Sequence, residues 1–246
     1  SLVAGGLILP SFNINRMANS ANNKKLKVSV VGCGGRGTGA AVQALRADDN
    51  VELVAMADAF KDRLENSLNA IKEEMEGEKT VDVKEKNRFT GFNGYKKAID
   101  LADVVILATP PGFRPLHFKY AIDNDKHVFM EKPVATDAHG VRKVLETAKD
   151  ANRKKLNVVV GLQRRYQYSY LNILKQVRRG VIGKITSGQV RWNGAGVWVR
   201  ARKPNQTEME YQMRNWYYFN WLCGDHIVAQ HIHNIDVANW FLNEYP

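Results

Sequence analysis

The sequence predicts an α/β protein that begins with a doubly wound parallel sheet. Apolar runs typical of strands alternate with helical stretches of roughly 10–15 residues, which is the order that successive βαβ units produce. A glycine-rich turn separates the first run from the first helix. The chain of 246 residues is 44% apolar and 25% charged, which suits a globular protein with a sizeable core. This composition argues against disordered, collagen-like and multi-span membrane proteins.

The expected elements of the sheet follow one another without a long gap. Runs rich in β-branched or other apolar residues are expected strands: 27–31, 51–57, 104–108, 127–130 and 157–160. The segments between them carry helical patterns and are expected helices: 38–47, 61–75, 115–124 and 137–151. The run 104–108 is uniformly apolar, as expected for a central parallel strand. Residues 72–86 are dense in charge and are expected to form a solvated helix end and loop.

The alternation stops after about residue 162, where a second region begins. Helices are expected over residues 168–179 and 225–242, and a strand over residues 184–192. Residues 193–221 are irregular and rich in aromatic side chains. Because a lone strand cannot form a stable sheet, we interpret this region as the first part of an α+β domain. The expected domain boundaries are 1–24, 25–155 and 156–246.

The glycine-rich turn fits the G-x-G-x-x-G pattern that binds dinucleotide phosphates. It follows a strand and opens a helix, as this pattern requires. Gly32 would permit the tight turn, Gly34 would let the backbone approach a pyrophosphate, and Gly37 would let helix and strand pack closely. The helix N-terminus would face the phosphate charge. We therefore expect a nicotinamide dinucleotide to bind at Gly32, Gly34, Gly35, Arg36 and Gly37.

The residue that ends the second strand indicates which dinucleotide is used. Asp58 lies 21 residues after the last glycine of the turn. A carboxylate there accepts hydrogen bonds from a ribose 2′-hydroxyl and repels a 2′-phosphate, which favours NAD over NADP. Lys61 and Arg63 follow closely, so NADP remains the less favoured alternative.

Two strand ends carry distinctive residues at the edge of the sheet where open α/β folds bind ligands. Thr109 and Pro110 follow one apolar run, and Glu131, Lys132 and Pro133 follow the next. Both ends are expected to face the nicotinamide half of the cofactor. A cis Lys132–Pro133 bond would aim the lysine into the cleft, and a surface lysine is the alternative that the residues alone leave open.

The combined pattern resembles the Gfo/Idh/MocA family of NAD(P)-dependent sugar and cyclitol oxidoreductases. The resemblance covers residues 27 to about 243 and rests on these motifs: VVGCGGRGTGA, ADA after the second strand, ATPP followed by His117, MEKPVA, GLQRRY and GDHIVAQHIHNIDVANW. EKP followed by H-x-x-D on a later helix is fairly specific to the family. The resemblance implies a Rossmann domain followed by a substrate domain with an open, mainly antiparallel sheet.

The resemblance also implies roles for individual residues. Lys132 would contact the substrate hydroxyl and the nicotinamide ribose, where a cation favours a developing alkoxide. His233 would accept the hydroxyl proton, and Asp236, on the same helical face, would contact substrate or orient the site. The other residues expected at the cofactor are Thr109, Pro110, His117, Glu131 and Arg164. Tyr166 is expected at the substrate, and so is Trp216, because the aromatic stretch around it suits a sugar ring or, alternatively, a core.

One position departs from the family pattern. The residue four positions before His233 is usually acidic in the family, whereas here it is Ala229. Three explanations stay open: a different specificity, replacement by a neighbour such as Asp225 or His231, or a weakened enzyme.

The first residues and the charge bear on location and partners. The run LVAGGLILP and the polar stretch after it resemble a signal-peptide remnant and predict export to the periplasm; if the run is not a signal, a cytoplasmic location follows. The net charge is +11, and residues 141–221 hold 17 Lys and Arg against 4 Asp and Glu. This balance favours an acidic sugar or an acidic surface as partner, since no nucleic-acid motif is present.

The remaining expectations concern metals, membranes and assembly. Cys33 and Cys223 cannot form a disulfide framework, and no His and Cys cluster predicts a metal. No stable membrane span is expected, and a homo-oligomer formed through the substrate-domain sheet is expected from the resemblance.

Three functions are compatible with these residues. The first is an oxidoreductase that transfers a hydride between NAD(P) and a secondary alcohol of a sugar, sugar derivative or cyclitol. The second is a glycosidase with tightly bound NAD, which oxidises C3 transiently; exported Bacteroidetes-type members, which the chain resembles, include such enzymes of the α-N-acetylgalactosaminidase type. The third is a dinucleotide- or sugar-binding homologue with weakened catalysis.

Overall fold

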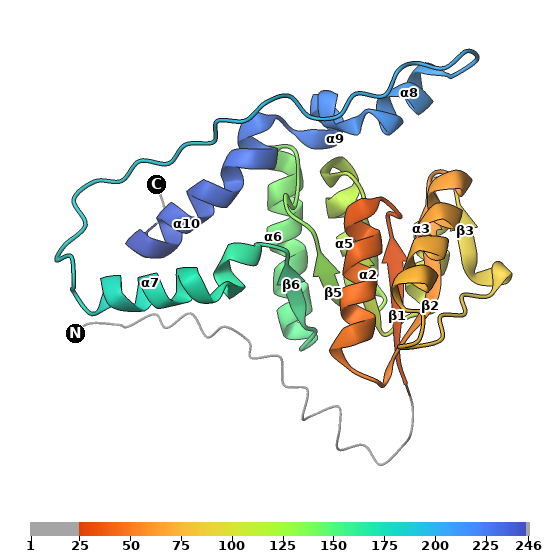
Figure 1. Cartoon of the computed structure of the whole chain (residues 1–246), viewed down its shortest axis with the longest axis horizontal. Coiled ribbons are helices and arrows are strands. Elements are labelled where there is room, and N and C mark those ends of the chain that lie inside the picture. Colours follow the sequence, from red (N-terminus) through yellow and green to blue (C-terminus); the bar gives the residue numbers. More distant parts are fainter. Residues whose placement is uncertain (1–24, 245–246) are drawn as a thin grey trace.

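The computed structural model describes residues 25–244, and its centre is one parallel sheet of six strands (Figure 1). The strands are β1 (Leu26–Val31), β2 (Val51–Asp58), β3 (Arg88–Thr90), β4 (Val104–Leu107), β5 (His127–Met130) and β6 (Val158–Val160). Their order in the sheet is β3-β2-β1-β4-β5-β6. The chain thus builds outward from β1 in one direction and from β4 in the other, and ligands bind where that direction changes. The predicted doubly wound sheet is confirmed.

Helices cover both faces of this sheet. The helices are α2 (Gly35–Ala47), α3 (Lys61–Glu74), α4 (Gly94–Asp100), α5 (Arg114–Asp123) and α6 (Ala138–Arg153). Helices α2 and α3 pack over a core that contains Val30 and Ile106, and α4, α5 and α6 pack over a second core that contains Val31 and Leu107. Neighbouring residues of one strand therefore enter opposite cores. This is the physical reason for uniformly apolar strands without polar alternation.

Three short elements between residues 76 and 103 were not expected from the sequence. β3 is an edge strand of three residues, Arg-Phe-Thr, next to the one-turn helix η1 (Glu85–Asn87). α4 has only seven residues. Elements this short carry too few residues for a period to be read, and the tertiary contact of β3 with β2 decides their structure.

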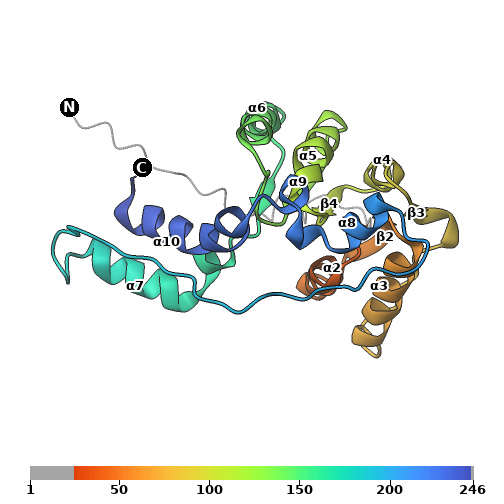
Figure 2. The same ribbon diagram turned by 90° about the horizontal axis from the view of Figure 1, so that it is seen from above.

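The second region is helical where it is regular. Its elements are η3 (Gln163–Tyr166), α7 (Tyr168–Arg178), α8 (Glu208–Arg214), η4 (Trp216–Tyr218), α9 (Asn220–Cys223), the π-helix η5 (Ile227–His231) and α10 (Ile232–Leu242). Figure 2 shows α8 close to β2, α2 and α3, whereas α7 and α10 lie on the side of the sheet where β6 stands in Figure 1. In place of the single helix expected over residues 225–242, the structure has the π-helical turn η5 followed directly by α10.

The prediction of a strand over residues 184–192 is wrong. These residues belong to what we call the outer segment (residues 181–200), which runs in extended form without any ladder partner in the described chain (Figure 1). Backbone groups of an isolated strand gain nothing over hydration in water, and nearly all of the outer segment is exposed. Within residues 25–244 the second region also contains no antiparallel sheet.

Candidate cofactor and catalytic site

The glycine-rich turn has the geometry that a phosphate site needs. Gly32 has a φ of +100°, and a Cβ atom there would lie 2.5 Å from the backbone nitrogen of Thr109. A Cβ at Gly37 would collide with the carbonyl oxygen of Gly32. In contrast, Gly34 and Gly35 have no atom within 4 Å of the place where a Cβ would stand. The first two glycines named are thus required by the fold, and the other two leave the backbone open to a ligand.

The start of α2 offers free donors beside this turn. Gly34 is its N-cap and provides no side-chain hydrogen bond, and the first turn contains no acidic residue. The N–H groups of a helix start need partners, and the helix dipole favours an anion there. Both conditions suit a pyrophosphate.

Asp58 connects the end of β2 to the glycine-rich turn. One carboxylate oxygen accepts the N–H of Cys33 at 2.7 Å, and the other accepts the N–H of Phe60 at 2.9 Å. Burial raises the pKa of Asp58, although both hydrogen bonds and the charge of Arg63 oppose this rise. Each oxygen retains a lone pair, so the carboxylate can still accept a ribose hydroxyl.

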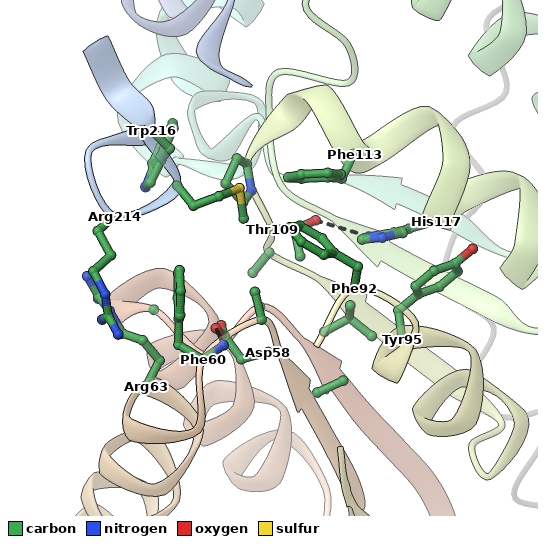
Figure 3. Close-up of a pocket in the computed structure, with 18 of the residues that line it drawn as sticks. Asp58, Phe60, Arg63, Phe92, Tyr95, Thr109, Phe113, His117, Arg214 and Trp216 are labelled. Carbon is green, nitrogen blue, oxygen red and sulfur yellow. Dashed lines mark hydrogen bonds between the residues drawn. The ribbon is translucent and has the colours of Figure 1, made fainter. Parts of the chain in front are cut away.

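A cavity of about 530 Å³ opens at these strand ends (Figure 3). Its volume lies in the range of sites for small ligands and cofactors. The sequence-predicted residues that line it are Gly32, Gly34, Gly35, Arg36, Asp58, Thr109, Pro110, His117 and Trp216. The structure therefore brings together most of the cofactor residues expected from the sequence.

One wall of the cavity comes from the second region. Trp198, Arg200, Met213, Arg214 and Trp216 line it opposite Phe60 and Arg63. Arg214 pairs with Asp62 at 2.9 Å, and its guanidinium carbon lies 4.0 Å from the ring centre of Phe60. Trp216, which was expected at the substrate, thus lies with this arginine on the cofactor cavity (Figure 3). Nothing in the sequence indicated this wall except its aromatic and basic content.

A buried network fixes the end of β4. The hydroxyl of Thr109 lies 3.2 Å from Nδ1 of His117, and the His117 ring packs 4.2 Å from the Tyr95 ring. Burial and the charge of Arg114 lower the pKa of His117 to about 3, so the ring is neutral at pH 7. Arg114 is completely buried and donates to the carbonyl oxygens of Leu107 and Thr109. His117 and Arg114 therefore shape the cavity rather than exchange protons.

Glu131 bridges the end of β5 to the start of α2. Its carboxylate lies 2.8 Å from Nε of Arg36. It also packs against Gly161, where a Cβ would come within 2.9 Å of its oxygen. Glu131 does not itself line the cavity, so the structure assigns it to the support of Arg36, which does.

Lys132 follows the end of β5 and points toward the second region. The Lys132–Pro133 bond is cis. The Nζ atom of Lys132 donates a hydrogen bond to the carbonyl oxygen of Ala229 at 2.6 Å. Burial lowers the pKa of Lys132, and the neighbouring carboxylate of Glu131 opposes this shift. Lys132 comes two residues after Met130, which pairs with Leu107 of β4, and its side chain does not line the cavity.

His233 lies one helical turn after Ala229 and is 8% exposed. Burial, followed by the positive charges of Lys132 and Arg164, lowers its pKa to about 4, while Asp236 opposes them. The imidazole is therefore unprotonated at neutral pH and able to accept a proton. Its ring stacks on Trp192, with 5.9 Å between ring centres.

Three other residues expected at the site have different partners. The Nε–H of Arg165 is shared by the two carboxylate oxygens of Asp236, at 2.9 and 3.0 Å. The NH2 group of Arg165 donates another hydrogen bond to the same carboxylate. Arg164 donates to Asn234 and stacks over Trp192. Tyr166 is 63% exposed. None of these side chains lines the cavity, and the first two hold η3 against α10 near His233.

The Gfo/Idh/MocA family profile, the oxidoreductase family with an NAD-binding Rossmann fold, matches residues 26–161. This chain belongs to that family. The match covers the described sheet, α2 to α6 and both strand ends that carry the candidate site. The resemblance to this family is therefore confirmed.

Several of the relatives that the chain matches are inositol 2-dehydrogenases. An inositol 2-dehydrogenase of Rubrobacter xylanophilus is 28% identical over 224 residues, which are 91% of this chain and 54% of the relative. The structure is similar to myo-inositol 2-dehydrogenase from Lactobacillus plantarum, with a TM-score of 0.64 and 24% identity over 91% of this chain and 58% of the other. The chain spans about half the length of the curated relatives that it matches.

A further similar structure contains ligands. Scyllo-inositol dehydrogenase from Lactobacillus casei, with bound NAD(H) and scyllo-inositol, has a TM-score of 0.62 and 21% identity over 89% of this chain and 57% of the other. At such identity the likeness establishes the fold. The family is described by an NAD-binding fold. Three features of this chain fit NAD independently: the open backbone at Gly34 and Gly35, the free start of α2 and the carboxylate of Asp58.

The described chain offers neither a metal site nor a membrane span. No group of three or more His, Cys, Asp or Glu side chains is arranged to hold a metal within residues 25–244. Over the same residues, no helix is both long and apolar enough to cross a bilayer.

Proposed function

We propose that the protein is an NAD-dependent dehydrogenase that transfers a hydride between the nicotinamide and a secondary alcohol of a sugar, sugar derivative or cyclitol. The observation that carries this proposal is the pairing of Lys132 with the helix of His233. Lys132 donates to Ala229, and its charge contributes to the low pKa of His233. A cation is thus bonded to the helix that carries a neutral base, although neither Lys132 nor His233 lines the cofactor cavity.

The two side chains divide the chemistry between them. The Lys132 ammonium has three N–H donors, and the bond to Ala229 leaves donors for the substrate oxygen. This charge stabilises the alkoxide that develops as the C–H bond breaks. His233 accepts the hydroxyl proton, which its low pKa permits because the ring enters the reaction unprotonated. Bound NAD would supply the hydride acceptor.

The test begins with the cofactor and continues with turnover. Purified protein is denatured, and any released nucleotide is identified by mass and absorbance. Refolded or native protein with NAD is then assayed for NADH with a panel of inositols, neutral sugars and uronates. We expect His233→Asn to reduce the rate at least about a hundredfold, the usual range for a lost general base. The matched control is His139→Asn, an exposed position on α6. Failure to bind any dinucleotide would reject the proposal.

A second candidate is the glycosidase with retained NAD. The observation that favours it is the cavity wall made by Arg214 and Trp216, since the ion pair of Arg214 with Asp62 fastens the second region over the cofactor cavity. Cleavage of a nitrophenyl glycoside without net NADH would support this candidate, whereas NADH accumulation with a free sugar supports the dehydrogenase. A third candidate, the weakened homologue, rests on Ala229 and is tested in the Discussion.

The cellular location and the oligomeric state of the protein follow from the sequence and are proposed with their own tests. Residues 1–24, which carry the signal-like run, lie outside the described residues. We propose export, which cell fractionation of the tagged protein tests, and a homo-oligomer, which light scattering tests. The basic balance of residues 141–221 leads us to include uronates in the substrate panel.

A further inference from the structure

The outer segment contacts the His233 ring through one aromatic side chain, Trp192. Trp192 stacks on His233 with 5.9 Å between ring centres and 23° between planes. The residues on both sides of it in the outer segment are exposed. His233, in contrast, is buried. The indole therefore forms part of the cover of the imidazole.

This contact is fastened from two directions. The guanidinium of Arg164 in η3 lies 5.7 Å from the Trp192 ring centre. The side-chain amide of Asn234, the residue after His233, donates to the carbonyl oxygen of Arg191 at 2.6 Å. Asn234 also accepts from Arg164. Trp192 is thus held between η3 and α10 although no regular secondary structure holds the outer segment.

We propose that Trp192 is a positioning residue for His233, which covers one face of the imidazole, fixes the plane of the ring and keeps water from it. The inference rests on the proposed role of His233 as the proton acceptor. An aromatic pair in this offset, nearly parallel arrangement adds stabilisation beyond burial. No other assigned feature of the site explains why a largely exposed segment places Trp192 here.

The electrostatic consequence has a definite sign. The charged groups that face His233 are Lys132 after β5, Arg164 in η3 and Asp236 in α10. Burial is the largest cause of the low pKa of His233, ahead of both cations. Removing the indole admits water and weakens this cause, while the three charges stay. The pKa of His233 must then rise, but it stays below the ordinary histidine value because two cations oppose one carboxylate.

The test measures the titration of His233 directly. Protein labelled at histidine is titrated by NMR, and His233→Asn assigns the resonance. We expect Trp192→Ala to raise the pKa by about one unit or more, a normal response to loss of burial. Trp192→Phe keeps an aromatic face and should hold the wild-type value. Val190→Ala changes a neighbour in the same segment that has no contact with the imidazole among the interactions described, and should leave the titration unchanged.

The outcomes separate this inference from the proposed function. An unchanged pKa in Trp192→Ala, or an equal rise in Trp192→Phe, overturns the role of Trp192. If Trp192→Ala lacks the wild-type circular dichroism spectrum, Trp192→Val replaces it and should give an intermediate pKa; no shift there also overturns the inference. If the pKa moves as expected but His233→Asn leaves turnover intact, the proposed function fails while the contact stands. Where turnover is measurable, the acidic limb of kcat/KM should follow the NMR value.

Discussion

The ammonium of Lys132 and the carbonyl oxygen of Ala229 are joined by a hydrogen bond of 2.6 Å across 97 residues of sequence. This bond ties the end of β5 to the helix that carries His233. The family resemblance led us to expect an acidic side chain at position 229, and here the buried methyl group of Ala229 leaves only the backbone to bond the lysine. The contact of Lys132 with the helix that carries His233 therefore needs no acidic side chain at position 229.

Ala229→Glu tests what that departure does. A carboxylate near Lys132 and His233 favours the protonated imidazole, so the pKa of His233 should rise and the acidic limb of the pH–rate profile should move to higher pH. Ala229→Gln has nearly the same shape without charge and should leave that limb in place. Kinetic pH profiles of both variants decide the matter. If Ala229→Glu leaves activity and profile unchanged, the departure does not weaken catalysis.

Two substitutions in the glycine-rich turn should have different effects, one on stability and the other on NAD binding. Gly32→Ala places a methyl group against the Thr109 backbone at a φ of +100°, and should lower stability by about 1–3 kcal/mol. Gly35→Ala meets no atom within 4 Å, so its melting temperature should not fall. Its methyl group would stand in the path of the pyrophosphate and should weaken NAD binding about tenfold or more. Thermal unfolding and fluorescence titration with NAD test the pair; wild-type affinity in Gly35→Ala would contradict the phosphate site.

The sequence alone could predict those features that local pattern determines. The turn from Gly32 to Gly37, Asp58 and the uniformly apolar run of β4 each carry their structure in a few adjacent residues, and the parallel sheet follows from their order. The strand expected over 184–192 failed because a strand depends on a partner, which no local pattern reveals. Lys132 and His233 were paired only through the family resemblance. Trp216 was placed at the substrate by composition, whereas a distant ion pair, Arg214 with Asp62, determines where it lies.

Stability should depend on pH through His117. Its pKa is about 3 in the folded protein because it is buried, and about 6.5 when unfolded. The unfolded chain therefore binds an extra proton between these values. The stabilisation is complete above about pH 6.5 and declines as the pH falls toward 3, by an amount of order several kcal/mol. In urea unfolding, the difference between wild type and His117→Gln should shrink from pH 7.5 to pH 4.5. A constant difference would show that His117 is not held neutral.

Arg214 should slow the escape of the dinucleotide. Arg214→Ala removes both the ion pair with Asp62 and the contact with Phe60, together about 1–2 kcal/mol for a partly exposed arrangement. NAD should then dissociate roughly tenfold faster, as a stopped-flow displacement experiment would show. The control is Arg202→Ala, whose partner Glu208 is exposed and lies off the cavity. Equal rates in wild type and Arg214→Ala would remove the support for a retained cofactor.

Asp236 distinguishes a structural role from the substrate contact that the family resemblance implies. Its carboxylate accepts hydrogen bonds from the Nε and NH2 groups of Arg165 and is mostly buried, which joins η3 to α10. Asp236→Asn breaks this charge pair and should lower stability by about 1–3 kcal/mol. It also removes the one negative charge that raises the pKa of His233, so the acidic limb of kcat/KM should move to lower pH. If the carboxylate serves only η3 and α10 in this way, KM for the alcohol should change less than twofold. A large rise in KM with unchanged melting temperature would instead place Asp236 on the substrate, as the resemblance implies, and would require the Arg165 pair to open during binding.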